Sequence, residues 1–344
     1  MAIPQYDMEI NINGVLYTSP AEMCNRVPKD VADFLAEWYD EQPTIMGHTS
    51  GSTGVPKPIS LLKSDMRASA RLTNSFLGID GNSTLLLCLS PSYIAGKMMI
   101  VRAIEARAQL LVVAPASTPL CEINTPVTMA AMVPMQVAET LRQPDGEKQL
   151  SHIKQLLVGG APVDEKLEER LISLPTNTYV TYGMTETVSH IALRRVGELS
   201  YTAIGDVTFT TDARACLVID APQLSGRRFV TNDVVELIDA RRFKWLGRYD
   251  NVIMSGGLKF CAEQLEEKIA HLIPYRYYIV AAPDERLGQH VVLVIESQPY
   301  DEDAVQQLRE DMKQHLARYE MPREIRFVEK FEETSSGKVK RLRE

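Results

Sequence analysis

Short, continuously apolar runs alternate with helical patterns between residues 84 and 183, and this alternation restricts the fold more than any other feature. The expected strands are "TLLLCLS" (84–90), "QLLVVA" (109–114), "QLLVGG" (155–160) and "TYVTYG" (178–183). Residues 92–107, 133–143 and 163–173 have the spacing of helices. Strands that are apolar throughout are typical of a parallel sheet covered on both faces by helices. The chain is therefore predicted to have an α/β fold.

The pattern changes after residue 200. Between 200 and 250 the segments alternate polar and apolar residues and are separated by turn residues, which favours antiparallel strands. A smaller α+β unit is expected beyond Asp250, with helices at 262–272 and 302–318. We predict a large N-terminal domain over residues 1–249 and a small C-terminal domain over residues 250–344.

Charge and cysteine usage exclude several classes of protein. The chain has 344 residues and a net charge of −8, which argues against general nucleic-acid binding. Its five cysteines are scattered without a CxxC pair, so a zinc site is not expected and reduced thiols in the cytoplasm are favoured. We recognise neither a signal peptide nor an apolar run of transmembrane length, and a cytoplasmic protein without a membrane partner is predicted.

The glycine-rich stretch "HTSGSTGVPKPISL" (48–61) is the first candidate for ligand binding. It is not a Walker A loop, because a proline rather than a glycine precedes Lys57. Four hydroxyls, two glycines and one lysine can nevertheless form an anion-binding turn. By itself the stretch is compatible with either a phosphate site or a solvated loop.

Further stretches each have a functional and a purely structural interpretation. "VGGAP" (158–162) can lie flat against a planar ring or form an ordinary strand-to-helix turn. In "TYGMTET" (181–187), Glu186 can hold Mg²⁺ or belong to a helix cap. Asp233 of "VTNDVV" and Arg248 of "LGRYDN" can bind ribose, or form a turn and a surface ion pair. Lys338 lies in the glycine-containing "TSSGKVKR" near the C-terminus.

Taken together and in this order, these stretches resemble the adenylate-forming superfamily of acyl-CoA synthetases, carrier-protein adenylation domains and luciferases. The matching segments are "TSGSTGVPK", "GGAP", "YGMTE", "TND", "GRYDNVIMSGG" and "SSGK", which extend over residues 49–338. The resemblance implies a hinge at Asp250 between the two domains, with ATP and Mg²⁺ as cofactors and CoA as a substrate. It also implies two steps, in which an acyl-adenylate forms and a thiol then displaces AMP.

The resemblance also implies a role for individual residues. Glu186 would hold Mg²⁺, Thr185 would contact the α-phosphate, and Lys338 would be the lysine required for adenylation. Tyr182 would stack on adenine, and Asp233 and Arg248 would bind ribose. The remaining positions would surround the β- and γ-phosphates or border adenine: Thr49, Ser50, Gly51, Ser52, Thr53, Gly54 and Lys57 for the phosphates, and Gly159, Gly160 and Ala161 for adenine.

Two departures from the superfamily concern the acyl substrate. The phosphate loop begins early, at Thr49, so the usual first subdomain is expected to be shortened. The segment "SPSYIAGKMM" (90–99) also lacks the histidine of many relatives. "YGMTETVSHIALRRVG" resembles the o-succinylbenzoate–CoA ligases of menaquinone biosynthesis, whose substrate has a second carboxylate. Lys97, His190 and Arg194 are candidates to bind that group, or else are surface residues.

Other functions stay open from the sequence alone. The alternatives are another aryl- or acyl-CoA ligase, a free-standing domain that loads a carrier protein, and a non-catalytic nucleotide-binding protein. A homodimer is a further possibility, because a shortened first subdomain would leave an apolar face to cover.

Overall fold

The computed structural model describes residues 8–23, 25–48, 58–333 and 339–341. Contacts within the chain form two compact units. Unit 1 comprises residues 1–208 and 220–227, and unit 2 comprises residues 209–219 and 228–344. The predicted domain boundary near Asp250 lies inside unit 2 and stays a prediction.

The sheet of unit 1 has a parallel centre and antiparallel edges. Its strands follow the order β11-β10-β9-β8-β7-β5-β6-β1-β2, and the pairs from β9 to β1 are parallel. The strands are β1 (Ile10–Ile12), β2 (Val15–Tyr17), β5 (Thr84–Leu87), β6 (Gln109–Val112), β7 (Val127–Met132), β8 (Ile153–Val158), β9 (Asn177–Gly183), β10 (His190–Arg195) and β11 (Tyr201–Ala203). The predicted α/β class is confirmed, because the continuous apolar runs form the parallel strands.

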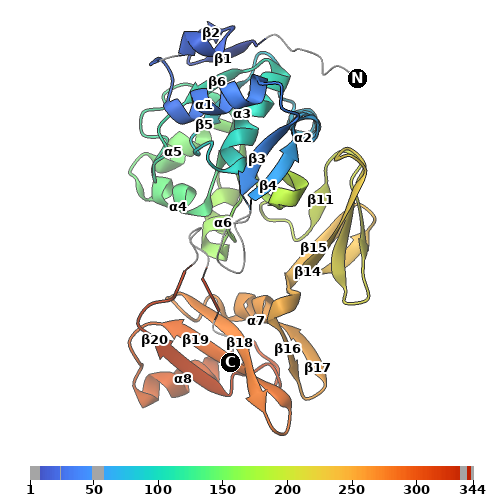
Figure 1. The fold of residues 1–344 in the computed structure, drawn as a ribbon. Coiled ribbons are helices and arrows are strands. Elements are labelled where there is room, and N and C mark those ends of the chain that lie inside the picture. Colours follow the sequence, from blue (N-terminus) through green and yellow to red (C-terminus); the bar gives the residue numbers. More distant parts are fainter. Residues whose placement is uncertain (1–7, 24, 49–57, 334–338, 342–344) are drawn as a thin grey trace. The chain divides into compact units, whose positions relative to one another are not determined.

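Helices lie against this sheet in Figure 1, and apolar residues of helices and strands form a common core, for example Val137 and Leu171 with Leu156. They are α1 (Lys29–Tyr39), α2 (Lys63–Leu77), α3 (Ile94–Ala106), α4 (Pro134–Arg142), α5 (Gly146–Ser151) and α6 (Glu165–Ile172), with the 3₁₀ turns η1 (Pro20–Met23) and η2 (Thr185–Thr187). Helix α3 is buried on every side from Gly96 to Ala103, since it lies between the sheet and α2. The predicted helices at 92–107, 133–143 and 163–173 correspond to α3, α4 and α6.

A separate hairpin flanks the glycine-rich stretch. Strands β3 (Thr44–His48) and β4 (Pro58–Leu62) pair antiparallel, with His48 opposite Pro58. Residues 49–57 between them lie outside the described residues. The hairpin has no counterpart among the predicted elements, because its strands are short and follow no long apolar run.

Unit 2 contains two groups of antiparallel strands. The first follows the order β12-β13-β14-β15, and the second is a five-stranded sheet of order β17-β16-β19-β18, in which β20 pairs parallel with β19. The elements are β12 (Thr208–Thr211), β13 (Cys216–Ala221), β14 (Arg227–Asp239), β15 (Arg242–Arg248), η3 (Tyr249–Asn251), β16 (Val252–Ser255), β17 (Leu258–Cys261), α7 (Ala262–Ile269), β18 (Tyr277–Asp284), β19 (Gly288–Glu296), α8 (Glu302–Met312) and β20 (Glu324–Val328).

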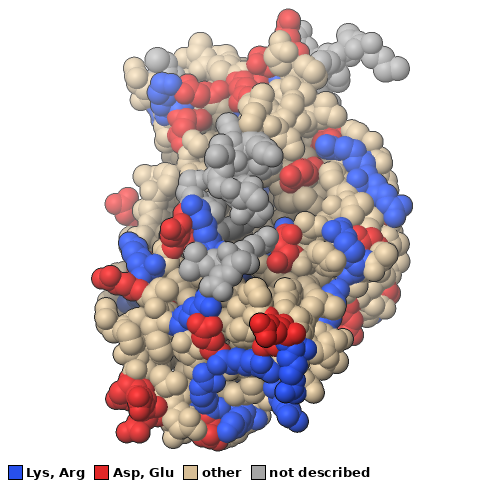
Figure 2. Space-filling view, turned by 60° about the horizontal axis from the view of Figure 1, so that its bottom comes forward, with Lys and Arg blue, Asp and Glu red and all other residues tan. Residues whose placement is uncertain are grey.

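The second sheet of unit 2 has its own core. Helices α7 and α8 place Leu265, Ile269 and Met312 against Ile279 and Leu293 of the central strands. Figure 2 shows acidic and basic side chains beside one another on the surface, and several ion pairs of unit 2 have this arrangement, for example Arg323 with Asp284. The predicted change to antiparallel strands after residue 200 is confirmed by these sheets.

Candidate active site

The carboxyl ends of β8 and β9 lie side by side and bring two of the predicted motifs together. These strands pair in parallel, with Val158 opposite Val180. Gly159 follows β8 directly, and a Cβ atom there would lie 2.1 Å from Thr181 Oγ1, so any larger residue would force the Thr181 side chain to move. Gly160 has a φ of 85°, which also favours glycine. Open α/β sheets bind ligands at such strand ends.

Tyr182, Thr185 and Glu186 follow at the same edge of the sheet. Tyr182 lies on β9, with its ring centroid 5.7 Å from that of Tyr201. Thr185 and Glu186 form the turn η2, which is closed by a hydrogen bond from the Met184 amide to the Thr187 hydroxyl at 2.9 Å. Within the described residues the Glu186 carboxylate makes no hydrogen bond or ion pair. This carboxylate is therefore available to a hard cation.

Part of the predicted site lies outside the described residues. This holds for the phosphate-loop residues, namely Thr49, Ser50, Gly51, Ser52, Thr53, Gly54 and Lys57, and also for Lys338. The hairpin β3–β4 leads into and out of the loop. Beside Lys338, Val339 forms a bridge with Glu333.

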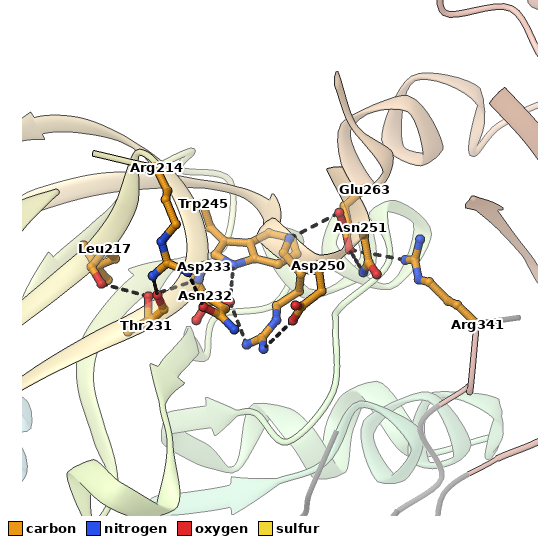
Figure 3. Close-up of polar contacts among 11 residues, drawn as sticks. Arg214, Leu217, Thr231, Asn232, Asp233, Trp245, Asp250, Asn251, Glu263 and Arg341 are labelled. Atoms are coloured by element: carbon orange, nitrogen blue, oxygen red, sulfur yellow. Dashed lines mark hydrogen bonds and ion pairs between the residues drawn. The ribbon is translucent and has the colours of Figure 1, made fainter. Parts of the chain in front are cut away.

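Asp233 and Arg248 face one another across the antiparallel pair β14–β15 (Figure 3). Arg248 Nη1 donates to Asp233 Oδ1 at 3.3 Å, and the Trp245 indole donates to the same oxygen at 3.3 Å. Arg248 Nη2 lies 3.5 Å from Asp250 Oδ2. Burial lowers the pKa of Arg248, but Asp233 and Asp250 outweigh it and raise this pKa. The structure thus places these three predicted residues in one network in unit 2.

Two of the three residues predicted to bind a second carboxylate already contact a carboxylate of the protein. Arg194 on β10 donates from both terminal nitrogens to Glu168, at 2.6 and 2.9 Å. Lys97 on α3 lies 3.3 Å from Glu37 and 4.7 Å from the centre of the Phe34 ring. The roles predicted for Arg194 and Lys97 stay predictions, and both would require these ion pairs to open.

His190, the third candidate, is buried at the start of β10. Its Nε2 lies 3.0 Å from Thr73 Oγ1, and its Nδ1 lies 3.3 Å from Ser189 Oγ. The Thr73 hydroxyl donates to the Ser69 carbonyl, so His190 Nε2 carries the proton and donates to Thr73. Burial, and then the charge of Arg102, holds the pKa of His190 well below 6.5. His190 is therefore neutral at pH 7.

Arg102 belongs to the same cluster, although the sequence analysis does not single it out. Its side chain is 2% exposed, and its Nη2 donates to Ser189 Oγ at 2.7 Å. Its Nε has no hydrogen-bond partner, and no acidic side chain among the described residues pairs with it. Burial lowers the pKa of Arg102 to about 10, so it stays charged at pH 7. The sequence around Arg102 in α3 is mostly apolar, and it does not indicate whether an acidic residue from elsewhere in the chain pairs with this arginine.

The hydrogen-bond directions form one continuous chain. Arg102 donates to Ser189, so the Ser189 hydroxyl can donate to His190 Nδ1. His190 donates in turn to Thr73. The cluster of Arg102, Ser189, His190 and Thr73 therefore has one cation and no anion.

The described residues were also searched for a pocket, a metal-binding cluster and a membrane-spanning helix. A shallow pocket of about 350 Å³ opens at the opposite edge of the sheet, beside the first residues of β7, β8 and β9, and none of the predicted site residues lines it. In the described part of the chain no three His, Cys, Asp or Glu residues cluster as a metal site would require. None of the helices described here is long and apolar enough to cross a membrane.

Comparison with known proteins identifies the family. The model of the AMP-binding enzyme family matches residues 15–223, and that of the AMP-binding enzyme C-terminal domain matches residues 277–338. The solved structure of an AMP-forming acyl-CoA synthetase/AMP-acid ligase II-like protein from Dyadobacter fermentans is 34% identical. The match covers 92% of this chain and 95% of that one, with a TM-score of 0.63.

Two proteins named for succinylbenzoate are also similar. A 2-succinylbenzoate–CoA ligase from Bacillus cereus is 25% identical, over 97% of this chain and 76% of the relative. The fold also matches o-succinylbenzoate CoA synthetase from Bacillus subtilis in complex with its acyl-adenylate. That match has a TM-score of 0.74 and 21% identity, over 94% of this chain and 75% of the other. The chain therefore belongs to the AMP-binding enzyme family and is an AMP-forming acid–CoA ligase.

Proposed function

We propose that this ligase activates 2-succinylbenzoate, a step of menaquinone biosynthesis in the cytoplasm, and that Arg102 binds the carboxylate that does not react. The observation that carries the proposal is the buried guanidinium of Arg102, which has an unpartnered Nε and no acidic partner among the described residues. The similarity to ligases named for this diacid supports the choice of substrate. Four free cysteines in the described residues agree with a reducing compartment.

A buried charge without a counter-ion is costly, since its hydration is lost and nothing replaces it. A carboxylate bound beside Arg102 would supply the missing charge and could accept two parallel hydrogen bonds from Nε and one Nη atom. Only the bond from Nη2 to Ser189 occupies the guanidinium in the described contacts. A substrate with a second carboxylate fits this residue better than a fatty acid does.

His190 would assist as a neutral group. Because its pKa is held well below 6.5, it contributes no charge to the binding of the diacid. It would instead fix the Ser189 hydroxyl, which accepts from Arg102 and lies between the two side chains. Arg102 would therefore supply the positive charge, and His190 would orient the Ser189 hydroxyl that accepts from Arg102.

The nucleotide would bind through the residues predicted for it. Gly159, Gly160 and Ala161 would border adenine and Tyr182 would stack on it, while Asp233 and Arg248 would bind ribose. Thr185 would contact the α-phosphate. Glu186 makes no hydrogen bond or ion pair among the described residues and would fit Mg²⁺, because this ion is commonly held by one or two carboxylates together with phosphate oxygens. When bound, Mg²⁺ would neutralise phosphate charge.

In the first step a carboxylate oxygen of the acid attacks the α-phosphorus of ATP, and pyrophosphate leaves. Two anions approach one another, so the donors of the loop at 49–57 and Lys338 would act by stabilising negative charge. In the second step the thiol of CoA attacks the acyl carbon, loses its proton and displaces AMP. The role of the protein in both steps is to position and to stabilise charge, and no covalent intermediate with a side chain is required.

Mass spectrometry tests the proposal. The purified protein is incubated with Mg-ATP, CoA and 2-succinylbenzoate, and in parallel with analogues that lack one of the two carboxylates, other aryl acids and fatty acids. A thioester from 2-succinylbenzoate in clear preference to the monoacids, lost in Lys338→Ala, is the expected result. Thioester formation from a monoacid with equal efficiency would contradict the proposed substrate. An adenylate that is transferred only to a carrier protein would contradict CoA as the acceptor.

A further inference from the structure

Two tyrosines from different strands meet on one face of the sheet of unit 1. Tyr182 lies on β9 and Tyr201 on β11, and β10 runs between these two strands. Adjacent strands are about 4.8 Å apart, so the backbones of β9 and β11 are separated by roughly 10 Å. The two ring centroids are nevertheless 5.7 Å apart, with an angle of 59° between the ring planes. The side chains therefore lean toward one another across β10, at a separation typical of an attractive aromatic pair.

Small residues in the neighbouring strands leave room for this contact. Ala192 of β10 is opposite Tyr182 on one side and opposite Ala203 of β11 on the other. Directly opposed residues share a face of a sheet, and so do residues two apart on one strand, which places Tyr201 on this same face. Ala192 is 0% exposed and Ala203 is 3% exposed. A larger side chain at position 192 would stand between the two rings.

Tyr201 is itself held by Arg194. The Arg194 guanidinium lies 5.7 Å from the centre of the Tyr201 ring, which is within the range of a cation–π interaction. Both terminal nitrogens of this guanidinium donate to Glu168 of α6. The side chains of Arg194 and Glu168 are 15% and 17% exposed, so this ion pair is largely shielded from solvent. A continuous series of contacts therefore joins α6, Arg194, Tyr201 and Tyr182.

We propose that Tyr201 is a positioning residue for the nucleotide, which holds the ring of Tyr182 in the orientation in which adenine stacks on it. The inference rests on the stacking role proposed for Tyr182. Tyr182 is partly exposed, so part of its surface is accessible to a ligand. A ring that is held in place before the ligand arrives loses less conformational freedom on binding, and the ligand binds more tightly. Arg194 would act through Tyr201 without contacting the nucleotide.

Binding of Mg-ATP tests this role, measured by isothermal titration calorimetry without acid or CoA. In Tyr201→Leu the Kd for ATP should rise about threefold to tenfold, the range expected when an aromatic contact is lost. Tyr201→Phe keeps the ring and should stay within about twofold of the wild-type value. An unchanged Kd in Tyr201→Leu, or an equal rise in both variants, would overturn the proposal.

A double variant shows whether Tyr201 acts through Tyr182. Tyr182→Ala removes the ring that stacks on the base, and its Kd for ATP should rise on the order of tenfold. The addition of Tyr201→Leu to Tyr182→Ala should then raise the Kd by less than about twofold, because the ring that Tyr201 orients is already absent. Additive rises would show that Tyr201 affects the nucleotide by another route and would contradict the positioning role.

Tyr179→Leu is the matched control for the loss of a tyrosine ring. Tyr179 lies on the same strand as Tyr182, three residues away and hence on the opposite face of the sheet. Its ring centroid is 5.9 Å from that of Phe76. The Kd for ATP should stay within about twofold of the wild-type value, while thermal unfolding measures the loss of stability in each variant. A rise in Kd as large as in Tyr201→Leu would assign the effect to a general loss of packing and overturn the proposal.

Ala192→Val provides a second, independent variant. The larger side chain would separate the two rings without changing either tyrosine, so the Kd for ATP should rise as it does in Tyr201→Leu. A folded Ala192→Val with the wild-type Kd would contradict the role of the ring contact.

These binding assays contain no acid and therefore do not depend on the proposed substrate. If the wild type binds ATP but forms no thioester from 2-succinylbenzoate, that substrate alone is refuted. If the wild type binds ATP and the Tyr201 variants bind it equally well, the role of Tyr201 alone is refuted. A wild type that binds no ATP would overturn both the proposed nucleotide site and this inference.

Discussion

Two arginines of unit 1 differ in whether an acidic side chain among the described residues balances their charge. Arg194 on β10 donates twice to Glu168 and once to the Glu198 carbonyl, and its ring contact with Tyr201 completes a closed structural cluster. Arg102 on α3 is more deeply buried, yet its described side-chain partner is the uncharged Ser189. An arginine whose charge is already balanced stabilises the fold, whereas one without a counter-ion is able to bind an anion. The proximity of Arg194 to the "YGMTET" motif is therefore weaker evidence than the missing partner of Arg102.

Replacement of Arg102 should have the largest effect. In Arg102→Met, kcat/KM for 2-succinylbenzoate is expected to fall about 100-fold or more, because the bound carboxylate would lose its buried charge partner. Most of the change should appear in KM for the acid, with KM for ATP nearly unaltered. Steady-state kinetics with the diacid and with a monoacid measure the difference. Equal losses for both acids would contradict a role in binding the second carboxylate.

Replacement of Arg194 should affect stability instead. Arg194→Met leaves Glu168 partly buried without its partner and should lower the free energy of unfolding by about 1–3 kcal/mol. Denaturant unfolding measures this change. At a temperature where Arg194→Met stays folded, its KM for the acid should remain within about threefold of the wild-type value. The reason is that the lost ion pair joins two residues of the protein and does not involve the substrate. The comparison between the two arginines breaks down if KM rises as strongly here as in Arg102→Met.

The smallest expected effect is on the pH dependence of unfolding, which depends on His190 and Arg102. The pKa of His190 is lowered by burial and by Arg102, so the folded protein resists taking up a proton that the unfolded chain accepts near its usual pKa. The contribution to stability is complete above pH 6.5 and is lost progressively as the pH falls below it. Unfolding measured at pH 7.5, 6.5 and 5.5 should show a weaker loss in His190→Asn, and also in Arg102→Met. Identical pH dependence in all three proteins would show that His190 does not titrate as inferred.

Much of the fold followed from local patterns. The strands at 84–90 and 155–160 were predictable because a strand buried on both faces needs a continuous apolar run. Helix α2 and the hairpin β3–β4 have no counterpart among the predicted elements. Helix α2 has buried polar residues such as Thr73 and Asn74, and these obscure its apolar face in the sequence. Local sequence patterns therefore predicted the strands at the centre of the sheet, but not the hairpin and the helix on either side of residue 62.

The residues predicted to bind the nucleotide could be named from the sequence because each of their motifs is a short local segment. Gly159 and Gly160 follow a strand, and Asp233 and Arg248 lie in two successive strands that pair directly. Residue type and order along the chain are then sufficient to indicate them. What these residues bind, and the hinge at Asp250, stay predictions until the experiments above are carried out.

The sequence by itself determined the class of fold, the family motifs and the order in which they occur, because these depend on residues close together in the chain. The tertiary structure alone decided which charged side chains have partners. Glu168 neutralises Arg194 from 26 residues away, and Ser189 meets Arg102 across 87 residues. Pairing over such separations depends on how the helices pack on the sheet, and no local pattern encodes it. For that reason a buried arginine in an apolar helix became a candidate ligand only once its surroundings were known.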